Sequence, residues 1–397
     1  MKKRSVRSLD AATLAGRRAL VRVDYNVPLD GAGGVGDAAR IEATLPTLDL
    51  LLDGRARPIL MSHLGRPGGR VRPEESLRPV AAVLQQCLGV PVHFLESTDT
   101  DLAVQTSHEL PEGEVLLLEN TRFLPGETAN DPALGRRLAL LGDFYVNDAF
   151  GTMHRAHASV VGAPAHLTPA AAGLLVEAEL EALACLRESP RRPFVVAFGG
   201  AKIGDKIPLM ESFLERADRI LIGGAIANTF LAAMGLPVGE SMIEDDAVTT
   251  AAELAARAPD RLVLPVDVVV GEPGRSSGQA VVAAEAIPWN LAAYDIGPDT
   301  REQFAAAIAK AGTFFWNGPM GWFEAEGYGE GTLSVAGAAA AAAEAGTFTV
   351  VGGGDSARAI REAGLADRVS HVSTGGGASL EFLAHGTLPG LEALDDA

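Results

Sequence analysis

The octapeptide GGAKIGDK (199–206) combines a flexible backbone with two ammonium groups. It follows the apolar run PFVVAF and contains Lys202 and Lys206, in a chain that has only five lysines against twenty-eight arginines. Glycine lets a backbone approach a phosphate closely, and a lysine brings a compact charge on a flexible stem. The segment therefore predicts phosphate binding by backbone and lysine together. If a helix begins inside it, the spacing of four places both lysines on one side of that helix.

Four further glycine clusters end apolar runs in the second half of the chain: GGA (223–225), NGPMG (317–321), GGGD (352–355) and TGGG (374–377). A glycine turn before a helix presents backbone amides and the positive end of the helix dipole to an anion. Any one cluster is equally well a tight turn, but five at successive strand ends favour an extended phosphate-binding surface. Asp355 follows the triple glycine, where it is either a ligand of a Mg²⁺–nucleotide complex or a helix N-cap.

Two common nucleotide motifs are missing. Lys206 is followed by Ile207, so GGAKIGDK is no GxxxxGK[ST] loop, and no GxGxxG follows the first strand. Both observations weaken the prediction of a P-loop or a dinucleotide-binding domain.

In the first half, the apolar runs end in polar and cationic residues instead. The residues at these ends, or close after them, are Arg22, Asp24, Asn26, Arg40, His63, Arg66, Asn120, Arg122, Asn147, Asp148 and Arg155. The planar guanidinium matches the geometry of carboxylate and phosphate, so several converging arginines predict a small substrate with multiple negative charges. Taken singly, each arginine is as well explained by a surface ion pair, and His63 by a buried core position.

His154 and His157 are three residues apart, a spacing seen in metal sites. Arg155 lies between them and disfavours a bound cation, so we do not predict a metal there.

Short runs rich in valine, isoleucine and phenylalanine alternate with helical patterns throughout. The predicted strands lie within 19–27, 57–64, 90–96, 114–120, 143–150, 192–200, 218–224, 260–270, 312–319, 346–354 and 368–377. Strands separated by helices predict an α/β fold of parallel sheets, here two doubly wound, Rossmann-like domains. We place them at 1–170 and 191–385, joined by a helix at 171–190; alternatively, that helix is simply the last one of the first domain. Ligands are expected beyond the carboxyl ends of the strands.

Composition excludes several classes of protein. The net charge of −18 argues against a general nucleic-acid binder, and no apolar run is long enough to cross a membrane. The charged start MKKRSVRSLD lacks the apolar stretch of a signal peptide. Two cysteines in 397 residues indicate a reducing compartment without a disulfide framework.

Together these segments resemble the phosphoglycerate kinase family over nearly the whole chain. The motifs that carry the resemblance, in the family's order, are RVDYNVP (22–28), SHLGRP (62–67), LENTRF (118–123), NDAFGTMHRAHAS (147–159), GGAKIGDKI (199–207), LPVDVVV (264–270), DIGP (295–298), WNGPMGWFE (316–324), GGGDS (352–356) and HVSTGGGAS (371–379).

The resemblance implies a cytoplasmic, monomeric, hinge-bending enzyme of glycolysis that transfers a phosphoryl group from 1,3-bisphosphoglycerate to ADP, giving 3-phosphoglycerate and ATP, reversibly and with Mg²⁺. It implies that the first domain binds phosphoglycerate through Asp24, Asn26, Arg40, His63, Arg66, Arg122 and Arg155. It also implies that the second domain binds the nucleotide through Lys202, Lys206, Glu324, Gly353, Gly354, Asp355 and Ser356, with Asp355 on the metal. In this family the C-terminus folds back onto the first domain, which implies the same for residues 386–397.

Phosphoryl transfer needs in-line positioning and neutralisation of charge. We therefore expect Arg40 and Lys202 to meet on the transferring group, with the amides of Gly354 and Gly375 as donors to its oxygens. The alternatives are a nucleotide-dependent dehydrogenase on a two-domain scaffold, for which the dinucleotide motif is missing, and a non-catalytic sensor of phosphorylated metabolites.

Five positions depart from the pattern of the family that the chain resembles. Ala178 stands where the family often has a lysine in the interdomain helix, Ala293 and Tyr294 where a Gly-Leu pair is common, Ala225 where glycine is frequent, and Trp322 where valine is usual. We expect the last four to border the nucleotide, so contacts to the base and ribose cannot be carried over from the family.

Overall fold

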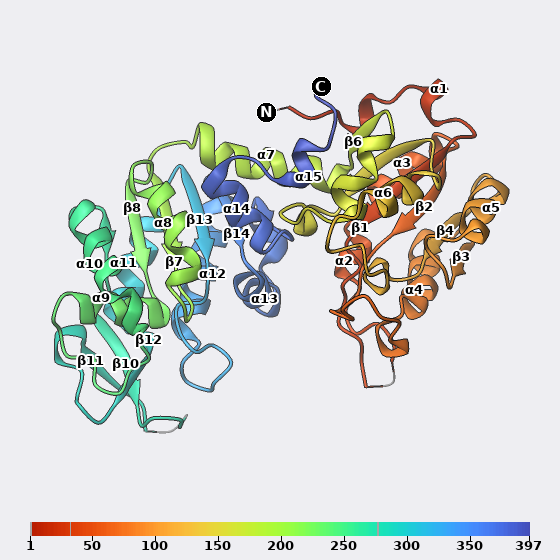
Figure 1. Cartoon of the computed structure of the whole chain (residues 1–397). Coiled ribbons are helices and arrows are strands. Elements are labelled where there is room, and N and C mark those ends of the chain that lie inside the picture. Colours follow the sequence, from red (N-terminus) through yellow and green to blue (C-terminus); the bar gives the residue numbers. More distant parts are fainter. Residues whose placement is uncertain (1, 32, 276–277) are drawn as a thin grey trace. The chain divides into compact units, whose positions relative to one another are not determined.

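The apolar runs of the first half form one parallel sheet in the computed structural model, which describes residues 2–31, 33–275 and 278–397 (Figure 1). The strand order is β3-β4-β2-β1-β5-β6. The strands are β1 (Arg18–Val23), β2 (Arg57–Met61), β3 (Val92–Leu95), β4 (Val115–Leu118), β5 (Phe144–Asp148) and β6 (Ala170–Ala172). Every residue of β1, β4 and β5 is buried, as expected for parallel strands covered on both faces.

Helices cover this sheet and fill the connections between its strands. They are α1 (Ala11–Leu14), α2 (Ala39–Glu42), α3 (Leu45–Asp53), α4 (Arg78–Leu88), α5 (Asp101–Glu109), α6 (Pro132–Ala139) and α15 (Pro389–Glu392), with short turns at Thr121–Phe123, Phe150–Thr152 and Ala158–Gly162. The side chains between helices and sheet, among them Leu20, Leu48 and Leu84, are fully buried.

The second half contains another six-stranded parallel sheet, of order β15-β14-β13-β7-β8-β9. Its strands are β7 (Phe194–Phe198), β8 (Arg219–Ile222), β9 (Leu262–Val263), β13 (Thr313–Asn317), β14 (Phe348–Gly352) and β15 (His371–Val372). Its helices are α8 (Ile207–Leu214), α9 (Gly224–Ala233), α10 (Val248–Arg257), α11 (Pro298–Ala309), α12 (Glu330–Glu344), α13 (Gly354–Glu362) and α14 (Gly377–His385). The fold class predicted from the sequence, two doubly wound α/β sheets, is thus confirmed.

Contacts divide the chain into two compact units. One runs to Glu181 and includes Thr387–Ala397; the other is Ala182–Gly386. The boundary falls within helix α7 (Leu174–Glu188). The C-terminal segment is held in the first unit by backbone bonds from Arg4 N to Asp395 O (2.8 Å) and from Gly390 N to Met153 O (2.8 Å).

Three details differ from the sequence-based expectation. The run 260–270, predicted as one strand, is split at Pro265 into β9 and β10 (Asp267–Gly271), which lie in different sheets. Proline lacks the amide that would continue the ladder. β10 pairs antiparallel with β11 (Ala280–Ala283) and β12 (Ala292–Ile296), a small sheet that the sequence did not predict. Finally, the helix expected over 171–190 begins at Leu174, because residues 170–172 form β6.

Both cysteines are free. Within the described residues, no helix combines the length and apolar character needed to cross a membrane.

Candidate functional site

Three predicted arginines meet at the carboxyl edge of the first sheet. Arg66, Arg122 and Arg155, together with Gly68, Gly69, Leu124 and Thr128, line a cavity of about 350 Å³. The three arginines follow β2, β4 and β5 respectively, so the sheet topology brings together side chains that are far apart in sequence. Three guanidinium groups around one small cavity make a site for an anion with more than one negative charge.

Arg122 is held in place by a hydrogen bond, although burial and neighbouring arginines disfavour its positive charge. Its side chain is buried, Nη1 donates to Gly65 O (2.6 Å), and its Nε has no hydrogen-bond partner within the described residues. Burial, with Arg155 and Arg22 nearby, lowers the pKa of Arg122 to about 10. An anion in the cavity would relieve this repulsion, which favours binding of a negatively charged ligand.

A second group joins Arg40, Asp24 and His63. Arg40 Nη1 forms an ion pair with an oxygen of Asp24, and His63 Nδ1 lies 3.7 Å from the other oxygen. Burial, followed by the positive charges of Arg22, Arg122 and Arg40, holds the pKa of His63 well below its usual value, so the ring is neutral.

The tautomer of His63 follows from its neighbour. Arg22 Nη2 lies 3.2 Å from His63 Nδ1. Because a guanidinium can only donate, Nδ1 accepts this bond and the ring carries its proton on Nε2. His63 can therefore offer one N–H to an anion without adding a charge.

Asn26 connects the two groups. Its Oδ1 accepts from Gly65 N (2.9 Å), next to Arg66, while Gly65 O accepts from Arg122. The charges of both Arg40 and Arg122 act on His63. All seven residues that the sequence suggested for the first domain thus lie in one region of this unit.

The sequence missed a buried network beneath these residues. Arg22, fully buried, donates from Nε to Ser159 Oγ (2.9 Å), and Ser159 Oγ donates to Glu127 Oε1 (2.5 Å). Glu127 is also fully buried and accepts from Ser159 N (2.9 Å). Its carboxylate offsets part of the arginine charge. Nothing in the turn LPGETAN (124–130) distinguished Glu127 from a surface residue.

In the second unit, a cavity of about 400 Å³ opens among the glycine clusters. Its lining is of two kinds. Gly200, Ala201, Gly224 and Asp355 bring backbone from the loop after β7 and from the first turns of α9 and α13, whereas Met242, Tyr294 and Trp322 bring apolar and aromatic side chains. Helix N-termini attract anions, so the cavity suits a molecule with a phosphate part and a flat apolar part.

Two glycines of this region are required for close packing between loops, whether or not a ligand is bound. A Cβ on Gly199 would lie 2.1 Å from Pro319 O, and one on Gly224, whose φ is +61°, 2.6 Å from Gly200 N. These loops therefore touch backbone to backbone, which only glycine allows. Gly354 differs, because a Cβ there would meet nothing within 4 Å. Gly354 is also the first residue of α13, and the first amides of a helix have no partner within that helix, so its amide is a candidate donor to a ligand.

The two lysines do not share a helix face. The helical turn begins only at Gly204, and α8 at Ile207, so Lys202 precedes the helix and the conditional expectation of a common side is wrong. Lys206 Nζ donates back to Gly199 O, while Lys202 is exposed and makes no ion pair within the described residues.

Glu244 holds the loop that carries these lysines in place, and no motif in the sequence indicated this role. Its Oε2 accepts from Ile203 N (2.7 Å) and Gly204 N (3.0 Å), forty residues away in sequence. Glu244 N in turn donates to Thr229 Oγ1 of α9 (3.2 Å).

The remaining predicted residues differ in what they offer a ligand. Asp355 is exposed in the first turn of α13 and lines the cavity, as does Glu324, which pairs with Arg358. Ser356 is buried and its hydroxyl joins two loops, accepting from Gly318 N (2.6 Å) and donating to Gly352 O (2.9 Å). The buried amide of Gly375 donates to Ser373 Oγ (3.2 Å).

The described residues contain no cluster of three or more histidine, cysteine, aspartate or glutamate side chains suited to a metal. Mg²⁺ is compatible with this, because it commonly takes one or two carboxylates and fills its shell with phosphate oxygens and water. Asp355 fits that pattern; a metal without its phosphates would have little to hold it.

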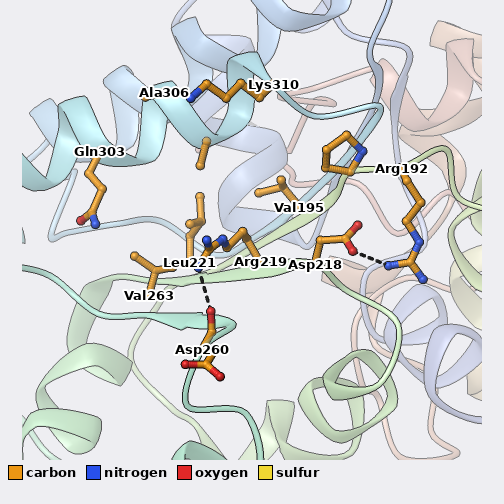
Figure 2. Close-up of a pocket in the computed structure, with 12 residues that line it drawn as sticks. Arg192, Val195, Asp218, Arg219, Leu221, Asp260, Val263, Gln303, Ala306 and Lys310 are labelled. Carbon is orange, nitrogen blue, oxygen red and sulfur yellow. Dashed lines mark hydrogen bonds and ion pairs between the residues drawn. The ribbon is translucent and has the colours of Figure 1, made fainter.

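A larger cavity, of about 830 Å³, lies at the opposite edge of the same sheet (Figure 2). It is lined by Val195, Leu221 and Val263 of the strands, by Gln303 and Ala306 of α11, and by Lys310 directly after that helix. Two of its cations are engaged, Arg192 with Asp218 (2.7 Å) and Arg219 with Asp260 O (2.7 Å). Ligands of parallel sheets bind at the carboxyl edge, so the smaller cavity is the stronger candidate.

Known proteins resemble the chain along its whole length. A family model described as "Phosphoglycerate kinase" matches residues 9–386. Phosphoglycerate kinases from Chloroflexus aurantiacus and Rubrobacter xylanophilus are each 51% identical, covering 100% of this chain and 100% and 99% of their own. The solved structures of phosphoglycerate kinase from Coxiella burnetii (38% identity, TM-score 0.87) and Pyrococcus horikoshii (32%, 0.85) each cover 98% of both chains.

Proposed function

The chain belongs to the phosphoglycerate kinase family of phosphotransferases with a carboxyl acceptor, and from that premise we propose how its two units divide the reaction. The first unit binds 3-phosphoglycerate or 1,3-bisphosphoglycerate. The second binds ADP or ATP with Mg²⁺. The observation that carries this division is the cavity of Arg66, Arg122 and Arg155, whose concentrated positive charge suits a small anion.

In the first unit, the three arginines take the phosphate that stays on the glycerate. Arg122 is preorganised by its bond to Gly65 O, so little side-chain entropy is lost on binding. Neutral His63 donates from Nε2, and Asn26 holds the Gly65 turn in place. Asp24 orients Arg40 through their ion pair, which leaves the other guanidinium nitrogens to reach the reacting end of the substrate.

In the second unit, the amides at the starts of α9 and α13 and the loop 353–356 bind the phosphates of the nucleotide. Lys206 neutralises them after exchanging its bond to Gly199 O. Glu324 and Asp355 line the cavity, and Asp355 holds the metal. When bound there, Mg²⁺ would supply positive charge that neutralises the phosphates during transfer.

Transfer itself needs no general base in the direction of ATP synthesis, because an acyl phosphate has a good leaving group. It needs charge neutralisation and exclusion of water. Arg40 and Lys202 supply the positive charges that meet on the moving phosphoryl group. The amide of Gly354, at the start of α13, donates to its oxygens; that of Gly375 can do so only by giving up Ser373 Oγ.

We also propose that the enzyme acts as a monomer in the cytoplasm. Sedimentation of the purified chain at micromolar concentration measures the oligomeric state. A dimer would contradict the proposal of a monomer.

The test of the function is a coupled assay with 3-phosphoglycerate, ATP and Mg²⁺. We expect turnover that a chelator abolishes and excess Mg²⁺ restores. Arg40→Ala and Lys202→Ala should each lower kcat on the order of a hundredfold or more, the typical effect of removing one donor to the transition state. Circular dichroism checks that both variants fold. Turnover that survives chelation would contradict the role of the metal, and near-normal kcat in either variant would contradict the role of that residue.

A further inference from the structure

Four of the five positions that depart from the family's pattern lie together in the cavity of the second unit, and Ala178 is the exception. Ala225, Ala293, Tyr294 and Trp322 all line it. The two larger ones replace aliphatic side chains by aromatic rings, and these rings are in contact, with centroids 5.5 Å apart. One wall of the cavity is therefore aromatic in this chain, where the family's pattern would make it aliphatic.

This wall is rigid. The buried Tyr328 packs behind both rings, 4.8 Å from Tyr294 and 6.3 Å from Trp322, with its plane within 6° of the indole plane. Trp322 N donates to Tyr294 O (2.8 Å), which ties the two backbones. The hydroxyl of Tyr294 accepts from Gly274 N (3.0 Å), which fixes the ring at its far end. The rings are therefore held in place before any ligand arrives.

The indole of Trp322 is nonetheless not covered. Trp322 is 42% exposed, whereas Trp316, in β13 of the same unit, is completely buried. An aromatic ring that is fixed from behind and open toward a cavity offers its face to a flat partner. Nucleobases stack on such rings, and stacking is tolerant of the base because every base has a π-face.

The polar part of the cavity lining determines which end of a nucleotide lies against the aromatic rings. The helix N-termini at Gly224 and Asp355 favour the phosphates, so the apolar rest of a nucleotide falls to the remaining walls. Ala225 and Ala293 are small and leave room beside the rings. A cavity of about 400 Å³ is within the usual range for such a ligand.

We propose that Trp322, supported by Tyr294 and Tyr328, is the residue on which the nucleobase of ADP or ATP stacks in this chain. The inference rests on the proposed nucleotide site and deepens it: the glycine loops hold the phosphates, and the aromatic wall holds the base.

Kinetics of three variants test the proposal. In Trp322→Val, which installs the side chain usual in the family, the KM for ATP should rise about two- to tenfold, the range expected for loss of one aromatic contact. The loss should lie in that KM rather than in kcat or the KM for 3-phosphoglycerate. Inorganic tripolyphosphate, which has no base, should inhibit Trp322→Val and the unchanged protein equally. Trp322→Phe should keep most of the affinity, because it keeps a ring.

Trp289→Phe is the matched control, since Trp289 is an exposed tryptophan (82%) of the same unit that does not line the cavity. Equal KM values for ATP in Trp322→Val and Trp289→Phe would overturn the proposal. The proposal would also be overturned if Trp322→Val lost as much affinity for tripolyphosphate as for ATP. That result would mean that Trp322 acts on the phosphate loops instead.

Fluorescence provides a readout that does not depend on turnover. ADP should quench tryptophan emission in the unchanged protein and in Trp289→Phe, but not in Trp322→Phe; tripolyphosphate should quench none of them. Quenching that survives in Trp322→Phe would overturn the proposal. If the chain shows no kinase turnover but ADP still quenches Trp322, the proposed function fails and the base site stands. If turnover is normal and neither measurement responds to Trp322, only the base site fails.

Discussion

At the scale of single residues, burial decides what each charged group can do. Arg22 and Glu127 are completely buried and satisfy each other through Ser159, so they support the site without reaching a ligand. Arg122 is buried with an unsatisfied Nε and a lowered pKa, so it gains from a bound anion. Residue type alone could not separate these two arginines.

Lys202 is the residue for which charge alone is not expected to suffice. It lies exposed before the first helical turn and next in sequence to Ala201, which lines the cavity. A flexible ammonium at this position can follow a phosphoryl group between two oxygens. A planar guanidinium would favour one geometry. We expect Lys202→Arg to lower kcat on the order of tenfold to a hundredfold, the scale of small misplacements in active sites.

The matched control is Lys310→Arg, since Lys310 is an exposed lysine of the same unit that lines the cavity at the opposite edge of the sheet. Steady-state kinetics with saturating substrates compares the two. Equal kcat values in both variants would mean that any positive charge serves at position 202.

At the scale of elements, carboxylates hold loops and helix ends in place. Glu244 accepts two amides of the lysine loop, and Asp267 accepts from Thr300 N (2.8 Å) in the first turn of α11. Asp148 caps α7, accepting from Leu175 N (2.9 Å) and Val176 N (3.4 Å). These residues act through the backbone they position.

Glu244→Ala leaves the amides of Ile203 and Gly204 without their acceptor. We expect the KM for ATP to rise several-fold, since each lost hydrogen bond to a charged group is worth about 1.5–3 kcal/mol and part is recovered from water. The loop 199–206 should also become a new site of limited proteolysis, detected by mass spectrometry of the fragments.

Glu244→Gln is the conservative control, because its amide oxygen can accept the same two bonds. It should restore most of the affinity and the resistance to protease. Equal KM values in the Ala and Gln variants would contradict a positioning role for Glu244.

Asp148 makes stability depend on pH. It is completely buried, its Oδ2 has no partner within the described residues, and burial raises its pKa to about 7. Between about pH 4 and pH 7 the folded state therefore holds a proton that the unfolded state has released. This contribution is complete below the unfolded pKa and is lost as the pH rises through about 7.

In Asp148→Asn the group stays neutral, so the pH dependence from this site disappears. Relative to the variant, the free energy of unfolding of the unchanged protein should fall from pH 5 to pH 8, with a slope of at most about 1.4 kcal/mol per pH unit. Urea titrations at four pH values measure the difference, in which other titrating groups largely cancel. Parallel curves for the two proteins would show that Asp148 does not titrate in this range.

At the scale of the whole molecule, each unit has its own sheet, core and cavity. In-line transfer requires the donor and acceptor oxygens to meet, and water must be excluded from the acyl phosphate. We therefore expect closure on binding. The radius of gyration from small-angle X-ray scattering should be smaller with 3-phosphoglycerate and a non-hydrolysable ATP analogue than with either ligand alone. An unchanged radius would contradict the hinge model.

The sequence by itself determined the fold class, the family and the chemical character of each sheet edge. These follow from local properties: apolar runs alternating with helical patterns, arginine and histidine after the strands of one half, and glycine after those of the other. The comparisons confirm the family, and the sheet order confirms the fold. The assignment of individual residues to the substrates stays a prediction.

Only the tertiary structure decided which residues meet. The Glu127 carboxylate under Arg22, the Glu244 clamp on the lysine loop and the ring contact of Tyr294 with Trp322 all join segments that are distant along the chain. The same holds for the glycines that proved necessary for packing between loops. Such contacts depend on strand order and on the paths of the connections, which local patterns do not encode; that is why the sequence could name Lys202 but not the carboxylate that holds its loop.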